Sequence, residues 1–284
     1  MTLTQKLLFK LSLFGLALLA LAYWLGWLNT EMTQGQQIIS GSYGKGPNIG
    51  AVGHLGGVPV VVPPGFAHFV EYDGDPHFME RRKGPRPERT FQSGISSFGF
   101  WVRYPDMATA TWENREERYV KYLSTTPWMR VGINANSNYG YRGDNSDAMT
   151  FFFNNALKSA QNFHQYERLP EKQHELTVYT PKDVDLSRRI VGNPKGRDDF
   201  DTNLYNHKAE NGKIDTYIKC PNMMRDADKC DHDFILDPSM KVWVSVSYRK
   251  GLLPHWRDIQ ARLTETLLSF RSTDASPHPS AQKE

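Results

Sequence analysis

Hydrophobic and polar positions alternate most regularly near the C-terminus of the chain. In residues 241–249, KVWVSVSYR, every second position is a valine or a tyrosine, which is typical of a strand with one buried face. After Gly251, apolar or semipolar residues recur at helical spacing from a start near Pro254: Trp256, Ile259, Leu263, Thr266, Leu267 and Phe270. We therefore predict a strand followed by an amphipathic helix.

Shorter runs predict the remaining elements. We expect strands over residues 57–62, 66–72, 97–104, 128–133, 174–179 and 214–220, and helices over 112–123 and 147–157, the second capped by Asp147. Residues 73–88, 182–203 and 231–233 are predicted to be loops or turns. Strands and helices follow one another without a βαβ rhythm. The expected class is α+β, a mainly antiparallel sheet with flanking helices, in one domain over residues 57–270; two subdomains divided near 140–170 are the alternative.

A long uncharged segment precedes this domain. Residues 11–28 are apolar and cover about 27 Å as a helix, close to the hydrocarbon thickness of a bilayer. Lys6 and Lys10 lie before the segment, so the positive-inside rule places residues 1–10 in the cytoplasm and the domain outside it. A single-pass anchor in a bacterial inner membrane, with a periplasmic C-terminal domain, is predicted. A signal peptide cleaved after Ala22 is the alternative, and it exports the same domain.

Two further segments differ in composition from the predicted domain. Residues 29–56 are polar and rich in glycine, with seven glycines between residues 41 and 57, and they are predicted to form a tether. Residues 271–284 are polar and are predicted to be a disordered tail.

The chain has two cysteines, Cys220 and Cys230. In an oxidising compartment a lone pair at this spacing is most simply a disulfide. A zinc site using Cys230 and His232 is the alternative, but the spacing between the cysteines matches no common zinc motif. We therefore predict a disulfide and no metal site.

Charge and motifs restrict the possible functions. Lys and Arg number 34 against 31 Asp and Glu, a net charge of +3, which does not favour a nucleic-acid binder. The chain lacks a Gly-x-Ser-x-Gly motif, an HExxH motif and a phosphate-binding loop. Its sequence therefore predicts no catalytic residue and no cofactor, and indicates a protein that is not an enzyme.

Aromatic residues are concentrated in one third of the chain. They include Phe98, Phe100, Trp101, Tyr104, Trp112, Trp128, Phe151, Phe152 and Phe153. A packed core is one explanation, and an exposed protein-binding surface is the other. The sequence does not identify the residues of such a surface.

Four short patches resemble a known group of proteins. They are residues 56–60 (GGVPV), 70–76 (VEYDGDP), 103–107 (RYPDM) and 247–256 (SYRKGLLPHW). These patches resemble membrane-anchored periplasmic proteins of Gram-negative bacteria associated with immunity to type VI secreted lipase effectors. The resemblance covers residues 56–270 and implies a protein partner, with no catalytic residues to carry over.

Three hypotheses of function follow. The first is a membrane-tethered periplasmic binding protein that neutralises a toxic secreted lipase or phospholipase by occluding it. The second is a structural or adaptor component of a bacterial envelope or secretion assembly. The third is an envelope hydrolase whose acids or histidines converge only in the folded chain.

Overall fold

The computed structural model describes residues 50–272, apart from gaps at 77–79, 81–82, 86, 112, 121–125, 162–164, 183–201, 222–227 and 238. The predicted cytoplasmic segment 1–10, the anchor 11–28, most of the tether and most of the C-terminal tail lie outside this range. No helix in the described part combines the length and the apolar character needed to cross a bilayer.

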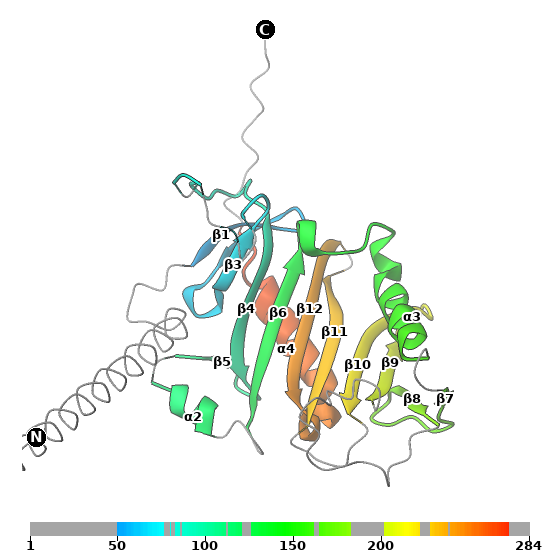
Figure 1. Cartoon of the computed structure of the whole chain (residues 1–284). Helices are drawn as coiled ribbons and strands as arrows, with labels where there is room; N and C mark the ends of the chain where they lie inside the picture. Colours follow the sequence, from blue (N-terminus) through cyan, green and yellow to red (C-terminus); the bar gives the residue numbers. More distant parts are fainter. Residues whose placement is uncertain are drawn as a thin grey trace, which may run out of the picture. The chain divides into compact units, whose positions relative to one another are not determined.

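Antiparallel pairing dominates the described chain. A long sheet has the strand order β3-β4-β6-β12-β11-β10-β9-β8-β7, with β5 beside β4, and a separate hairpin pairs β1 with β2. Helices α2, α3 and α4 accompany these strands (Figure 1). The strands are β1 (Ala51–Leu55), β2 (Val58–Val62), β3 (His68–Tyr72), β4 (Ile95–Arg103), β5 (Ala108–Thr109), β6 (Trp128–Ala135), β7 (Tyr166–Arg168), β8 (Thr177–Pro181), β9 (Thr202–Lys208), β10 (Ile214–Pro221), β11 (Lys229–Asp237) and β12 (Met240–Arg249). The helices are α2 (Arg115–Val120), α3 (Ala148–Gln161) and α4 (Trp256–Leu268).

The main core lies between the sheet and α4. Along β12 the valines and Tyr248 are buried, as the alternation predicts, and the apolar positions of α4 that face them are at most 3% exposed: Trp256, Ile259, Leu263 and Leu267. The β1–β2 hairpin closes this core at one end, where the amide of Val61 donates to the carbonyl of Phe270. The predicted α+β class and the predicted C-terminal strand and helix are confirmed.

A second, smaller core holds α3 against the other face of the sheet. Phe153 of α3 contacts Tyr179 and Tyr217, with ring centroids 5.5 and 5.8 Å apart. Met149 and Phe153 are buried, as their helical spacing predicts. The predicted cap is wrong, because Asp144 caps a short 3-10 turn before α3 and accepts a hydrogen bond from the amide of Ser146. Asp147 instead forms an ion pair with Lys213 at 2.8 Å.

Several predicted boundaries differ from the structure. Residues 51–55 of the predicted tether form β1, which pairs with β2 in full register. Strand β8 begins three residues later than predicted, because His174 and Glu175 have positive φ angles and form a turn. At the C-terminal end, Arg271 pairs with Asp237, and Ser272 donates to the carbonyl of Pro59. The described residues belong to one compact unit.

Two central strands were not predicted. Strand β9 contains the buried side chains of Asn203 and Asn206, and β11 contains the sequence Asp-His-Asp that resembles a turn. The turn prediction for residues 231–233 is therefore wrong. Two of these polar residues are stabilised by hydrogen bonds from neighbouring strands: Thr180 donates to Asn203 at 2.9 Å, and Trp243 donates to Asp233 at 2.9 Å.

Candidate functional site

Cys220 and Cys230 form the predicted disulfide. Lys219 of β10 is opposite Asp231 of β11, and the cysteines therefore face each other at the next position, with their Cα atoms 4.3 Å apart. Both are fully buried in the main core. The bond joins two neighbouring strands, β10 and β11. The prediction of a structural disulfide is confirmed.

His232 lies deep between the sheet and α4. Its Nε2 is 3.1 Å from Oε1 of Gln260, and its Nδ1 is 3.3 Å from the hydroxyl of Tyr248. Burial lowers the pKa of His232 to about 4, because the interior cannot solvate an imidazolium ion. His232 is therefore a neutral core residue at pH 7. In the part of the chain that the structure describes, no three His, Cys, Asp or Glu side chains are grouped as metal ligands.

The face of the sheet opposite α4 is uncovered over β4, β6 and β12 in the described structure. Helix α3 packs on β10 and also contacts β11, and α2 lies near the lower end of β4, so β4, β6 and β12 lie between the two helices (Figure 1). Phe152 of α3 borders the face through Trp243, with ring centroids 3.9 Å apart. We call the side chains of these strands and of neighbouring β11 that point away from α4 the open face: Ser97, Gly99, Trp101, Trp128, Arg130, Gly132, Asn134, Trp243, Ser245, Ser247, Arg249, Lys229, Asp231 and Asp233. Trp128 and Asp233 are buried, and the others are half-buried or exposed.

Cross-strand register fixes the order of residues on the open face. Trp101 is opposite Arg130, Arg130 is opposite Ser247, and Ser247 is opposite Asp231, which together form one row across four strands. In the adjoining row Gly99 is opposite Gly132, so two positions carry no side chain and the centre of the face is shallow. Aromatic and charged groups therefore surround a flat centre.

The acidic part of the open face is held by neighbouring side chains. The indole of Trp243 donates to Asp233 at 2.9 Å, and the hydroxyl of Ser247 donates to Asp231 at 2.6 Å. Burial raises the pKa of Asp233, although its hydrogen bonds to Ser245 and Trp243 act in the opposite direction. Because these bonds fix the side chains before a partner arrives, little conformational entropy is lost on binding.

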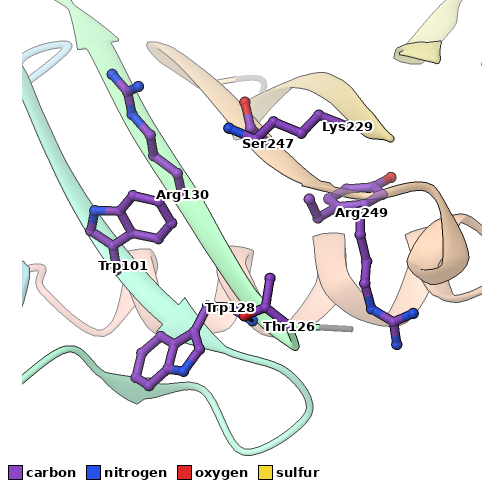
Figure 2. A pocket seen from close by; sticks show the side chains of 8 residues that line it. Trp101, Thr126, Trp128, Arg130, Lys229, Ser247 and Arg249 are labelled. Atoms are coloured by element: carbon purple, nitrogen blue, oxygen red, sulfur yellow. Dashed lines mark hydrogen bonds between the residues drawn. The ribbon is translucent and has the colours of Figure 1, made fainter. Parts of the chain in front are cut away.

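A small hollow of about 30 Å³ lies at one end of the open face. We call it the basic notch; the side chains that line it include Trp101, Thr126, Trp128, Arg130, Lys229 and Arg249. Figure 2 shows the two indoles on neighbouring strands, and it shows the guanidinium groups of Arg130 and Arg249 extending to opposite sides. Its volume suits one or two waters or a small polar group, and it is far below the 300 Å³ or so of a typical small-molecule site.

Each indole of the basic notch has a guanidinium group near its ring. The Cζ atom of Arg118 lies 5.5 Å from the ring centroid of Trp101, and that of Arg103 lies 5.8 Å from the ring of Trp128. Arg103 is itself held by ion pairs with Asp106 and Glu117. Such cation–π contacts fix the orientation of the rings. Of the aromatic cluster in the sequence, Phe98, Phe100, Trp128 and Phe153 are buried, whereas Phe151 is exposed and Trp101 is half-buried.

A second hollow lies along α4 on the opposite side of the sheet. This groove has a volume of about 560 Å³ and contains a histidine between an acid and an arginine. Nδ1 of His207 is 2.7 Å from Asp215, and Nη2 of Arg257 donates to Nε2 of His207 at 3.0 Å. Both ring nitrogens of His207 are therefore engaged, and the hydroxyl groups among the described lining residues are those of Thr216 and Thr264, of which Thr216 donates to Gln260 at 2.9 Å.

Comparison with known proteins yields one structural likeness. No family model matches the chain, and no curated protein matches it. An immunity protein of the type IV secretion system of Stenotrophomonas maltophilia aligns with 79% of this chain and 94% of its own, at 18% identity and a TM-score of 0.49. A likeness at that level is too weak to assign a fold family or a function.

Proposed function

We propose that this chain is a periplasmic binding protein, tethered to the inner membrane, that neutralises a toxic secreted lipase by binding and occluding it. The observation that carries the binding role is the open face: a sheet surface with tryptophan and arginine side chains and a polar surround. Tryptophan and arginine are the residue types in which the energy of protein interfaces is concentrated. The hollow on this face, about 30 Å³, is much smaller than a typical small-molecule site, so the face suits a protein better than a small molecule.

Two features support the location outside the cytosol. The apolar segment 11–28 is long enough to span a bilayer and follows two lysines. The Cys220–Cys230 bond is of the kind that persists in oxidising compartments. Anchoring at the membrane surface raises the local concentration of an inhibitor where a phospholipase acts. The choice of a lipase as the target is supported by the sequence patches at residues 56–60, 70–76, 103–107 and 247–256.

Co-expression tests this function. The full-length chain is produced in bacteria together with a candidate secreted lipase directed to the periplasm, and growth and complex formation are measured. We expect survival and a stable complex with the cognate lipase. The control is the same lipase inactivated at its catalytic serine, which should still bind but should not require protection.

Three results would contradict the proposal. The lipase hypothesis fails if no candidate binds and none is neutralised. Purification of the chain with envelope or secretion components instead of a lipase would favour the adaptor function. Labelling of both cysteines as free thiols on the cytoplasmic side of intact cells would refute the location.

A further inference from the structure

We propose that the basic notch is the part of the open face that recognises the partner, and that it binds an acidic segment of that protein. This inference rests on the proposed function, because it identifies where and by what chemistry the partner is held. Three side chains lining the notch are basic, Arg130, Lys229 and Arg249, and none is acidic. Within the described residues, neither Arg130 nor Arg249 forms an ion pair. Charge complementarity therefore selects a carboxylate-bearing partner.

The tryptophans make the site favourable for such a contact. Trp128 is only 2% exposed and Trp101 is half-buried, so the rings of both residues form an apolar part of the notch. A carboxylate that enters between these rings and the guanidinium groups loses part of its water, and its attraction to arginine is then stronger than at a fully solvated surface. The energy of the contact is thus concentrated in a few side chains, as in other protein interfaces.

The positions of the two arginines specify the form of the acidic segment. Arg130 is opposite Ser247, and Arg249 lies two residues after Ser247 on the same strand, so the arginines are diagonal neighbours. Cα atoms in that relation are about 7 to 8 Å apart. The guanidinium groups extend to opposite sides, so their charges are farther apart than the Cα atoms (Figure 2). The notch therefore fits a segment that carries more than one acidic residue better than a single carboxylate.

The remainder of the open face favours a protein over an anionic membrane. Asp231 lies in the same row as Arg130, and Asp233 lies in the next row. Asp233 is buried, but Asp231 is only half-buried, and its carboxylate would repel a continuous anionic lipid surface placed over the notch. A protein surface can instead place acidic groups at the notch and neutral or basic groups beside it, so mixed charge is a basis for choosing one partner.

The first experiment uses an acidic peptide, which makes the test independent of the identity of the partner. The full-length chain is titrated with blocked hexaglutamate, and binding is followed by tryptophan fluorescence and by calorimetry. We expect saturable binding that weakens as salt is added. The variant R130E/R249E should lose at least ten-fold in affinity, and so should R130E alone, which changes only an exposed side chain.

A matched control separates a local effect from a change in net charge. The variant K158E/K208E reverses two exposed lysines on α3 and β9, away from the notch, and alters the net charge by the same amount as R130E/R249E. We expect it to bind hexaglutamate like the wild type. Circular dichroism and thermal melting of every variant establish that it is folded. Equal loss in both double variants, or no saturable binding to the wild type, would overturn the inference.

The second experiment uses the lipase that the chain neutralises. R130E/R249E should weaken the complex ten- to a hundred-fold, and replacing the contacting acids of the lipase with lysine should restore its affinity for this variant. Unchanged affinity for the lipase would overturn the inference while leaving the proposed function intact. Conversely, hexaglutamate binding with no lipase complex would refute the proposed function alone. Binding to vesicles of phosphatidylcholine and phosphatidylglycerol is measured as well. If R130E/R249E weakens binding to these vesicles but not to the lipase, the notch is a lipid site and the inference is wrong.

Discussion

Protonation of His232 should make the domain lose stability in mild acid. His232 is fully buried, and its pKa falls from 6.5 to about 4 in the folded chain. Between these values the unfolded chain binds a proton that the native chain does not. Stability is therefore complete above about pH 6.5 and declines as the pH falls toward 4. Since one pKa unit corresponds to about 1.4 kcal/mol, the total contribution is about 3 kcal/mol.

The substitution H232Q isolates this effect, because glutamine stays neutral and can still bond to Gln260. Urea titrations of the full-length chain at pH 7.5, 6.5, 5.5 and 4.5 give the free energy of unfolding for each protein. Between pH 7.5 and 4.5 the wild type should lose about 2 to 3 kcal/mol more than H232Q. Carboxyl groups titrate in both proteins and cancel in this comparison.

An exposed histidine provides the control. His255 lies at the surface just before α4, and H255Q should retain the pH dependence of the wild type. The reasoning is refuted if the wild type and H232Q lose stability in parallel. That result would mean that His232 accepts its proton in the folded chain as readily as in the unfolded one.

Three further substitutions test the packing. Removing the disulfide with C220S/C230S should lower the free energy of unfolding by about 3 kcal/mol, because the bond closes a loop of about ten residues in the unfolded chain. In urea titrations, a reducing agent should destabilise the wild type but not this variant. Leu263→Ala should lower the free energy of unfolding by about 2 to 5 kcal/mol, because it opens a cavity under α4. Glu265→Ala, on the exposed side of the helix, should change it by less than about 0.5 kcal/mol. Equal effects would show that α4 is not packed as described. Gly56→Ala should lower the melting temperature more than Gly212→Ala. Both glycines have positive φ, but only at Gly56 would a new Cβ lie against backbone, 2.7 Å from the amide nitrogen of Lys241. A smaller effect at Gly56 than at Gly212 would contradict this contact.

The pattern of apolar and polar residues was sufficient to predict an element wherever one of its faces is apolar and the other polar. Strand β12 alternates between buried valines and outward polar or aromatic residues, and α4 places its apolar residues on one side, so both follow from the residue period. It was insufficient for β9 and β11. Their polar side chains are buried in the folded protein, where Asn203 and Asp233 gain hydrogen bonds from residues on other strands. A short segment of sequence contains no information about hydrogen-bond partners that lie far away in the chain.

By itself, the sequence determined the α+β class, the elements with a regular residue period and the Cys220–Cys230 pair. The class and the elements depend on residue spacing along the chain, and two cysteines allow only one pairing within the chain. The open face and the basic notch were decided only by tertiary structure. The order β4-β6-β12-β11 brings Trp101 and Arg130 beside Ser247 and Arg249, more than a hundred residues later in the chain. The physical reason is that strand order and register, set by burial of the opposite face against α4, decide which outward side chains become neighbours.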